Sequence, residues 1–354
     1  MARGPGDVNA QTLRLSVVVV AYNSAASLPA LLDALGAQMA ADDEVIVVDN
    51  ASHDATAALA AAHPAVGRVV EPGGNVGFAA GSNAGARAAT GDAVLLLNPD
   101  VVPEPGFLEA MRRPPEGWDA WMGLVLLADG EHVNTAGGEV HYLGFAWAGR
   151  YGLPAGAIPA EPHEVGFLSG ACMAVRREAW SRLGGFPVSF FMYGEDVDLS
   201  LRLRLAGHRF GLVPAARCRH DYAFDKGAGK WRLLERNRWL LVLRTYPRPL
   251  LIRVLPLMVL VEPVLLAYAI SSGWGRAKAR SWLGVAAALS RVRRERDEVQ
   301  RTARSGARTV AAGLTARLDS PFLGAAGRSG ALRAALGAYW RIARIGLRDA
   351  APPR

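Results

Sequence analysis

The sequence predicts an α/β fold in which helices cover both faces of a mostly parallel sheet. Through the first hundred residues, short runs rich in Val, Leu and Ile alternate with segments of helical periodicity. Strands that are apolar throughout are typical of parallel sheets buried on both faces. The chain has 354 residues, of which 51% are hydrophobic and 20% charged. It is therefore long enough to bury a large core and too apolar for intrinsic disorder.

The predicted elements follow a β-α order up to residue 97. Strands are expected at 15–21, 45–48, 68–70 and 93–97, and helices at 27–39, 55–62 and 77–89. Ser27 is the expected N-cap of the first helix, with Pro29 in its first turn. No internal repeat is evident.

The middle of the chain is less regular. Residues 101–190 are rich in Gly, Pro and Trp and predict mixed strands and long loops. A helix is expected at 195–205 with Gly207 as its C-cap, followed by strands near 209–213 and 217–220. From Trp231 onward the composition shifts to Arg, Ala and Leu, which predicts helices.

The charge divides the chain into two parts. Residues 1–230 hold 17 basic and 25 acidic residues, whereas residues 231–354 hold 23 basic and 7 acidic ones. The net charge of +8 is therefore the sum of an acidic body and a strongly basic C-terminal region. We expect two domains with these boundaries, and the asymmetry favours contact of the second with a membrane or another polyanion.

Cysteine usage and the N-terminus indicate a reducing compartment. Cys172 and Cys218 are the two cysteines, so no disulfide framework or cysteine-rich zinc site is expected. The first 15 residues contain Asp7 and no apolar core, so no secretory signal is visible. A cytoplasmic location follows as the expectation.

Polar residues follow the first two strands. Ala21, Tyr22 and Asn23 end the first strand, and Asp49 ends the second. In parallel sheets, ligands bind beyond the carboxyl ends of the strands, where a carboxylate accepts hydrogen bonds from a nucleobase or a ribose. Asn, Asp and Ser are also ordinary turn residues, and taken alone these positions favour that interpretation.

A glycine-rich segment, 73–85, follows the third strand. It lacks the G-x-G-x-x-G spacing of dinucleotide-binding turns. Gly77, Gly81 and Gly85 recur every four residues, which predicts a smooth helical face packed on the sheet. Asn75 and Asn83 remain candidates for ligand contact.

Two further segments carry carboxylates. The fourth strand runs into Asn98-Pro99-Asp100, and an Asp at this position is placed to hold a divalent cation on two phosphates, unless the segment is a plain turn. Residues 190–199 then place Glu195, Asp196 and Asp198 at a helix start, where acids also complement the helix dipole. The preceding aromatic run, 190–193, suggests a wall for a sugar or a lipid-linked acceptor, beside which Asp196 would be a general base.

These segments, in this order, resemble family 2 glycosyltransferases of the GT-A nucleotide-diphospho-sugar transferase fold, and most of all their rhamnosyltransferase-like branch. The matching segments are VVVVAYNSAASL, VIVVDNASHDAT, GGNVGFAAGSNAG, VLLLNPDV, FLSGACMAVRREAWSRLGGF and FFMYGEDVDLSLRLRLAGHRFGLVPAARCRH. They span about residues 13–222, nearly two-thirds of the chain.

The resemblance implies roles for particular residues. Asp196 would deprotonate the acceptor hydroxyl, Tyr193 and Glu195 would contact the acceptor, and Asp100 with His220 would hold Mg²⁺ or Mn²⁺. The predicted donor-binding residues are Ala21, Tyr22, Asn23, Asp49, Asn75, Gly77, Asn83, Asn98 and Asp100. This sequence departs from the family's usual Asp-x-Asp motif, because Asn98 replaces the first Asp. His220 is followed by Asp-Tyr-Ala-Phe, and alone it is more typical of a structural histidine than of a ligand.

The C-terminal region predicts contact with a membrane surface. Residues 254–270 are mostly apolar but include Pro256, Glu262 and Pro263, which favours an interfacial or re-entrant hairpin over a span. Later, one helical face carries an apolar row and the adjoining sector carries arginines. The apolar row is Leu332, Leu336, Tyr339, Trp340, Ala343 and Leu347, and the arginines are Arg333, Arg341, Arg344 and Arg348. Packing of this helix on the catalytic domain is the alternative.

The resulting prediction is an inverting, metal-dependent glycosyltransferase at the inner face of the cell membrane. The resemblance implies a dTDP- or UDP-sugar donor, with rhamnose the best candidate, and a glycan or polyprenyl-linked acceptor. One alternative is a sugar-1-phosphate nucleotidyltransferase, which would need a Gly-rich, Arg-bearing loop where this chain has AYNSAAS. The other is a nucleic-acid-binding protein, for which the tail lacks a fold motif and interleaved aromatic residues.

Overall fold

The computed structural model describes residues 12–221, 228–318 and 329–349. Its main sheet has the order β10-β12-β6-β11-β4-β1-β2-β3, with β5 beside β12 and β7 beside β6. The strands are β1 (Leu15–Ala21), β2 (Glu44–Asp49), β3 (Arg68–Val70), β4 (Ala93–Leu97), β5 (Val101–Pro103), β6 (Trp118–Leu126), β7 (Val133–Thr135), β10 (His163–Glu164), β11 (Cys172–Arg176) and β12 (Arg209–His220).

The pairing of β1 with its neighbours is parallel, as predicted. β1 runs parallel to β2 and β4, and β2 runs parallel to β3. The register pairs Ala21 with Asp49, so the carboxyl ends of β1 and β2 meet at one edge. β11 runs antiparallel between β4 and β6, which makes the sheet mixed.

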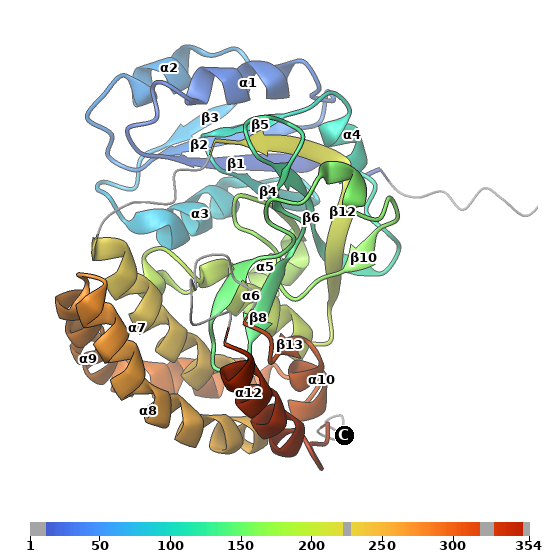
Figure 1. Ribbon diagram of the computed structural model, residues 1–354. Helices are drawn as coiled ribbons and strands as arrows, with labels where there is room; N and C mark the ends of the chain where they lie inside the picture. The colour runs from blue at the N-terminus through green and yellow to red at the C-terminus, as the bar shows by residue number, and fades with distance from the viewer. Residues whose placement is uncertain (1–11, 222–227, 319–328, 350–354) are drawn as a thin grey trace, which may run out of the picture.

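Helices cover both faces of this sheet (Figure 1). α1 and α2 lie above it in that view, while α3, α5 and α6 lie below. The helices of this part of the chain are α1 (Leu28–Gly36), α2 (Thr56–Ala62), α3 (Gly77–Ala88), α4 (Phe107–Met111), α5 (Arg177–Leu183) and α6 (Glu195–Leu205). Two 3₁₀ turns lie among them, η1 (Ala155–Ala157) and η2 (Val188–Phe190).

The glycine face of α3 explains how closely that helix approaches the sheet. A Cβ at Gly81 would lie 2.8 Å from Cγ1 of Val20, and one at Gly85 would lie 2.3 Å from Cγ1 of Val18. Any larger residue would push α3 away from β1. The predicted packing role of these two glycines is confirmed.

The sequence predicts most helices and strands correctly, but some ends differ and two predicted strands form one strand in the structure. The two strands expected at 209–213 and 217–220 are one strand, β12, with an irregularity between Val213 and Arg217. α6 has the predicted bounds, and Gly207 follows its C-cap, Ala206, with a φ of 80°. Cys172 and Cys218 are both buried and free, as expected.

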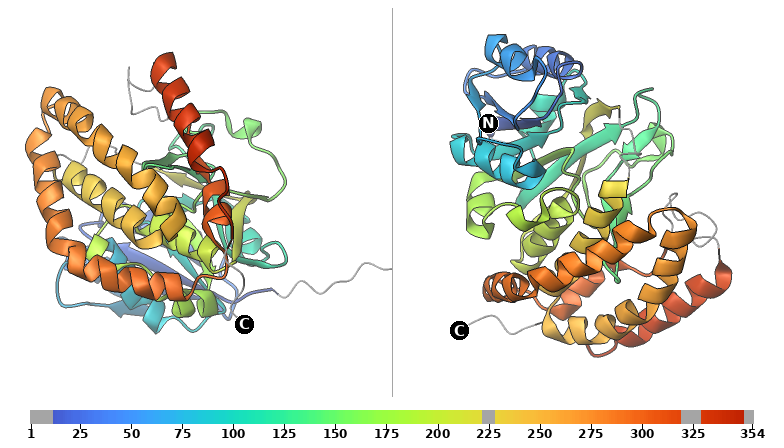
Figure 2. Two further views of the ribbon diagram at one scale, coloured as in Figure 1. Left: turned by 90° about the horizontal axis from the view of Figure 1, so that it is seen from below. Right: turned by 90° about the vertical axis from the view of Figure 1, so that its left-hand side faces the viewer.

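The C-terminal region is helical, as its composition predicts. Its elements are α7 (Ala228–Thr245), α8 (Arg248–Ser271), α9 (Gly275–Arg301), α10 (Ala307–Ala312) and α12 (Gly330–Ala343), with one short strand, β13 (Leu314–Thr315). β13 joins β8 (Gly138–His141) and β9 (Ala146–Ala148) in a second, three-stranded sheet. α7, α8 and α9 lie side by side below the main sheet (Figures 1 and 2).

Two hydrophobic cores hold the molecule together. The first lies around the main sheet, and the second joins α6 and β8 to the C-terminal helices. In the second core, Val197 and Leu201 of α6 are buried with Leu240 of α7 and with Tyr246, which directly follows α7. The predicted boundary at 230/231 falls inside α7, and the core beneath it belongs to both sides.

The two membrane expectations for this region change. Residues 254–270 form no hairpin, because α8 is one continuous helix that includes Pro256 and Pro263. The apolar face predicted for the last helix packs on the protein: the Trp340 ring stacks on Tyr142 with centroids 4.7 Å apart, and Leu336 is buried. The alternative of packing on the catalytic domain therefore holds for α12.

Candidate active site

The donor side of the candidate site lies at the carboxyl ends of β1 and β2. Asp49 is buried, and its Oδ2 accepts a hydrogen bond from the Ser52 N–H at 3.2 Å. Its Oδ1 is buried and makes no hydrogen bond within the part of the chain that the structure describes. A buried carboxylate oxygen without a partner costs free energy unless a ligand donates to it. This oxygen therefore fits the donor-binding role predicted for Asp49.

The loops after β1 and β2 are joined by side-chain hydrogen bonds. The Asn23 Oδ1 accepts from the His53 N–H at 2.8 Å, and the Asn23 N–H donates to Ser52 Oγ at 3.0 Å. Ala21 is buried, and its carbonyl accepts from the Asn50 N–H. Tyr22 is exposed, with its ring edge-on to His53. Tyr22 is therefore the residue of this group whose ring is open to a ligand.

The segment before α3 continues the same edge. Asn75 Oδ1 accepts from Asn50 Nδ2 and from the Gly77 N–H, each at 3.1 Å. In return, Asn50 Oδ1 accepts from the Val76 N–H at 2.9 Å. These bonds fix Asn75, which is exposed, beside the residue that follows Asp49.

Gly77 and Asn83 both have packing roles in the structure, and their contact with the donor stays a prediction. Gly77 has a φ of 81°, and a Cβ there would lie 2.4 Å from the Phe191 carbonyl oxygen. Asn83 donates to the Phe186 carbonyl and accepts from the Phe186 N–H, each at 2.8 Å. Both ends of the Asn83 amide are thus occupied, and α3 uses the two residues to hold the segment 186–191.

The third part of the site lies after β4. The Asp100 Oδ1 lies 3.1 Å from Nε2 of His220, and His220 is buried at the end of β12. The Asn98 N–H donates to the Ala171 carbonyl at 3.1 Å. The structure therefore brings Asp100 and His220 together, as the metal prediction requires, and ties Asn98 to the residue before β11.

The donor set at Asp100 and His220 suits a shared metal site. Among the described residues, no group of three or more His, Cys, Asp or Glu side chains converges as a metal site would require. A carboxylate and an imidazole are nevertheless acceptable ligands for Mn²⁺ or Mg²⁺, which also take phosphate oxygens and water. The two residues fit a cation held jointly by the protein and a diphosphate.

Asp196 is the second residue of α6, and its carboxylate binds two backbone N–H groups. Its Oδ2 accepts from the Gly170 N–H at 2.9 Å, and its Oδ1 accepts from the Val197 N–H at 2.8 Å. Gly170 precedes Ala171, whose carbonyl is bonded to Asn98. Two backbone steps therefore link Asp196 to the end of β4. Burial raises the pKa of Asp196 above the usual range, although these N–H groups oppose the shift.

Glu195 is enclosed beside Asp196. It is buried, and its Oε2 has no hydrogen-bond partner among the described residues. Burial, and then the charge of Asp196, raise the pKa of Glu195 well above the usual range. Tyr193 is half-buried, and the Lys230 ammonium lies 5.6 Å from its ring centre.

The aromatic run before α6 does not form one wall. Phe190 is fully buried in the second core, whereas Phe191 is exposed. The backbone here is strained, since the non-glycine residues Phe191 and Tyr193 have φ values of 65° and 72°. Phe191 and Tyr193 are thus the aromatic residues that remain for an acceptor.

Sequence reasoning missed the residue that holds this strained loop. The Asn237 amide of α7 donates to the carbonyls of Phe190, Met192 and Tyr193 at 3.1, 2.9 and 2.7 Å. Asn237 is buried in a helix whose sequence shows only a basic, Leu-rich pattern. Asn237 is the one carboxamide side chain in α7, and this was the available signal.

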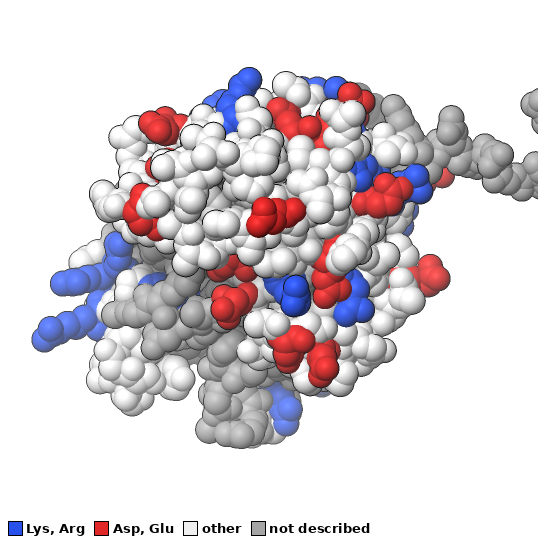
Figure 3. Space-filling view, turned by 90° about the horizontal axis from the view of Figure 1, so that it is seen from above, with Lys and Arg blue, Asp and Glu red and all other residues white. Residues whose placement is uncertain are grey.

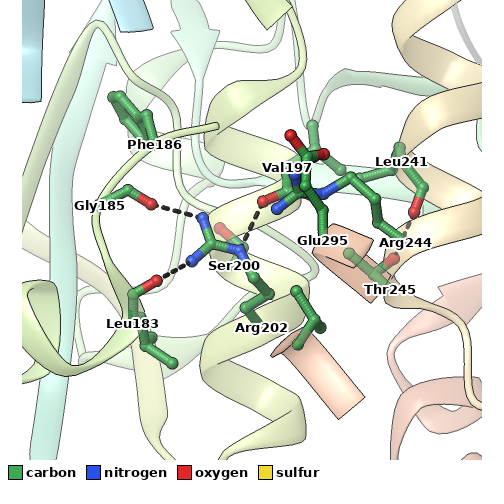
Figure 4. Close-up of polar contacts among 12 residues, drawn as sticks. Leu183, Gly185, Phe186, Val197, Ser200, Arg202, Leu241, Arg244, Thr245 and Glu295 are labelled. Carbon is green, nitrogen blue, oxygen red and sulfur yellow. Dashed lines mark hydrogen bonds and ion pairs between the residues drawn. The ribbon is translucent and has the colours of Figure 1, made fainter. Parts of the chain in front are cut away.

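A buried ionic network anchors the rest of α6. Asp198 is fully buried and binds Arg202 of the next turn and Arg244 of α7, and Arg244 also pairs with Glu295 of α9. Arg202 further donates to the carbonyls of Leu183 and Gly185 (Figure 4). Asp198 therefore has a structural role, and α6 is tied to both α7 and α9.

Asp49 ends β2, Asp100 follows β4 and Asp196 lies in the first turn of α6, which is the set of carboxylates expected of a nucleotide-sugar-dependent transferase. Comparison with known structures agrees on the fold. The chain is similar to S. aureus TarS 1-349, with a TM-score of 0.54 and 17% identity over 94% of this chain and 90% of that one. It is also similar to GalNAc-T7 solved with UDP, GalNAc and Mn²⁺, with a TM-score of 0.57 and 16% identity over 69% and 50%. The fold is GT-A, as predicted.

Sequence comparison supplies the family. The model of glycosyl transferase family 2 matches residues 16–184, and that of glycosyl transferase family group 2 matches 155–290. The chain is 33% identical over 238 residues to N-acetylglucosaminyl-diphospho-decaprenol L-rhamnosyltransferase of Mycobacterium tuberculosis, covering 60% of this chain and 78% of that protein. It is 30% identical to rhamnosyltransferase WbbL of Escherichia coli, covering 44% and 63%. The chain belongs to glycosyltransferase family 2 and is a glycosyltransferase.

Proposed function

We propose that this enzyme transfers rhamnose from a nucleotide-diphosphate donor to a hydroxyl of a polyprenyl-diphosphate-linked sugar, with inversion at the anomeric carbon. The relative from Mycobacterium tuberculosis, whose name states such a reaction, supports the sugar and the acceptor class. The observation that carries the mechanism is the position of Asp196, tied through Gly170 and Ala171 to the end of β4.

One group of residues binds the nucleotide-sugar donor and its diphosphate. The donor is a dTDP- or UDP-sugar. Asp49 Oδ1 accepts a hydrogen bond from its nucleoside, and the Tyr22 ring covers that nucleoside. Asp100 and His220 would hold Mn²⁺ or Mg²⁺, which neutralises charge developing on the leaving diphosphate when it is bound. The Mn²⁺ bound with UDP in GalNAc-T7 is consistent with this proposal.

Asp196 accepts the acceptor proton. The acceptor oxygen attacks the anomeric carbon as its proton passes to the Asp196 carboxylate, and the bond from that carbon to the diphosphate oxygen breaks. One displacement from the opposite face inverts the configuration without a carboxylate nucleophile. Burial makes this carboxylate a stronger base than an ordinary Asp, which suits proton removal from a sugar hydroxyl.

We further propose that the enzyme works at the inner face of the cell membrane, where a polyprenyl-linked acceptor would be presented. The strongly basic composition of residues 231–354 supports attraction to anionic lipid. On the face of the catalytic part seen from above, neither sign of charge forms a continuous patch (Figure 3). Attraction to a polyanion therefore has to come from elsewhere on the molecule.

Replacement of the proposed base tests the mechanism. Asp196→Asn keeps the shape of the side chain but removes the basic oxygen, so turnover should fall by about 10²–10⁴-fold. Binding of the nucleotide-sugar, measured by titration calorimetry, should change little. Asp297→Asn, at an exposed position of α9, is the matched control. Near-normal turnover of Asp196→Asn would exclude Asp196 as the base.

A second experiment tests the donor and the metal. Thermal shifts are measured with dTDP-rhamnose and with UDP-sugars, each with and without Mn²⁺. We expect the largest shift with dTDP-rhamnose and Mn²⁺, and a smaller one after Asp100→Asn. An equal shift for the Asp100→Asn variant would contradict the assigned metal site.

A further inference from the structure

One long stripe of α8 is exposed and apolar. Spaced three and four residues apart, its members face one side of the helix, as the i, i+4, i+7 pattern requires. They are Ile252, Pro256, Val259, Leu260, Pro263, Val264, Ala267 and Tyr268, all exposed. Leu260 and Val264 are 71% and 69% exposed. At 1.5 Å per residue, the 24-residue helix is about 36 Å long, so the stripe is a large apolar surface.

The opposite face of α8 is held inside the protein by ion pairs. Glu262 is buried, and it pairs with Arg238 of α7 and with Lys278 of α9, the latter at 2.7 Å. The indole N–H groups of Trp239 and Trp282 also donate to Glu262. Burial alone would raise the pKa of Glu262, but the two cations outweigh it and the pKa is lowered.

The ion pairs of Glu262 with Arg238 and Lys278 determine which face of α8 is buried and which is exposed. α8 is the one helix in the described ranges that is long and apolar enough to cross a membrane. To cross as a span, it would have to withdraw Glu262 from Arg238 and Lys278, which would carry the Glu262 charge into the bilayer without its cations and leave both cations to Glu235 alone. α8 therefore keeps its place against α7 and α9 and presents the apolar stripe outward.

The charges around the stripe match an anionic surface. From residue 248 to residue 294 the sequence holds eight basic residues and one acid, and that acid is the buried Glu262. Arg248 is exposed at the first turn of α8, and Arg276 and Arg280 are exposed at the start of α9. An apolar stripe with a basic rim is typical of a helix that lies in the plane of an anionic membrane.

α12 extends this basic rim. The Arg253 guanidinium donates to the carbonyls of Ala343 and Ile345, and the Tyr339 hydroxyl donates to the Arg253 carbonyl. The end of α12 therefore lies beside the first turns of α8. There Ile342 and Ile345 are exposed next to the exposed Arg341 and Arg344.

We propose that the outer stripe of α8 enters the interfacial layer of an anionic lipid bilayer, with the surrounding arginines on lipid phosphates. This inference rests on the proposed location at the membrane and assigns the surface that makes the contact. A second copy of the chain is the less suitable occupant, because it would bring two basic rims together. The surface is thus α8, in place of the apolar face of the last helix.

Vesicle flotation of the full chain tests this assignment. The variant is Leu260→Gln/Val264→Gln, which keeps helix propensity at two exposed positions. The matched control is Leu59→Gln/Leu153→Gln, at exposed apolar positions of the catalytic part. Vesicles contain phosphatidylglycerol with phosphatidylcholine, or phosphatidylcholine alone. We expect wild type and control to bind the anionic vesicles, and the α8 variant to bind at least tenfold more weakly.

Each of four other outcomes would contradict one part of the proposal. Failure of wild type to bind anionic vesicles at low salt would overturn the proposed membrane location itself. Equal binding by wild type and the α8 variant would keep the location but reject α8 as the contact. Retention of wild type in vesicles after an alkaline carbonate wash would show a span. Self-association of wild type without lipid that the α8 variant loses would make a second copy the occupant.

Discussion

Asp196 and Glu195 begin the same helix, yet their side chains meet different surroundings. Both Asp196 oxygens accept backbone N–H groups, while one Glu195 oxygen is buried without a partner in the described part of the chain. Burial raises the pKa of both carboxyls. The hydrogen bonds keep Asp196 closer to its ordinary value, so at neutral pH it is the better candidate for an ionised base.

The raised pKa of Asp196 predicts the pH dependence of turnover. A general base works in its deprotonated form, so kcat should rise with pH as Asp196 loses its proton. Because its pKa lies above the ordinary Asp value of about 3.9, the acidic limb of the profile should lie above that value too. The measurement is kcat against pH at saturating donor and acceptor. A profile that stays flat down to pH 4 would contradict a raised pKa in the base.

At the residue scale, sequence patterns predict the charged residues of the proposed site but not the residues that support them. Asp49 ends β2, Asp100 follows β4 and Asp196 lies in the first turn of α6, positions where polar side chains stand out in the sequence. The glycine-rich segment predicts Asn83 as a candidate for ligand contact. The residue that its amide binds in the structure, Phe186, is 103 residues away, and no local sequence pattern indicates such a contact.

At the scale of elements, the loop before α6 depends on α7. The loop holds Phe191 and Tyr193 at positive φ, a conformation that costs about 1–3 kcal/mol at each such residue. Hydrogen bonds from the Asn237 amide to three of its carbonyls compensate for this strain. Since the loop leads directly into Glu195 and Asp196, we regard Asn237 as a positioning residue.

Asn237→Ala should therefore impair the acceptor side of the reaction. It removes the two N–H donors that the Asn237 amide shares among three carbonyls, each donor worth about 1 kcal/mol, and frees the loop to relax. We expect kcat to fall by roughly tenfold or more, with the donor KM nearly unchanged. Steady-state kinetics measure both constants, and Arg232→Ala, at an exposed position of the same helix, is the control. A loss in donor KM with unchanged kcat would assign Asn237 to the donor side instead.

The helices of the C-terminal region show where sequence periodicity is informative and where it is not. Periodicity correctly identified one face of the last helix as apolar, and Trp340 and Leu336 of that face are buried. It could not say whether lipid or protein covers the face, because both are apolar. For α8 the pattern was hidden, since apolar residues surround the helix and only the partners of Glu262 distinguish its two sides.

At the scale of the molecule, the acidic body and the basic region share one core. Phe190, Val197, Leu201 and Leu205 precede the predicted boundary, yet they are buried together with residues of the C-terminal helices. Arg244 adds an ion pair with the fully buried Asp198 across the same boundary. The hydrophobic core therefore makes α6 dependent on the helices that follow it, despite the difference in charge between the two parts.

Removal of residues 231–354 should consequently unfold more than the tail. It would expose four buried side chains around α6, each worth about 1.5–3 kcal/mol, and the total is comparable to the whole stability of an ordinary domain, about 5–15 kcal/mol. We expect the chain 1–230 to be insoluble or to lack a cooperative thermal transition, whereas a chain ending at residue 349 should unfold like wild type. Calorimetry and near-UV circular dichroism measure this. A cooperative transition of 1–230 within a few degrees of wild type, with normal donor binding, would show that the catalytic part folds independently and that the shared core contributes little.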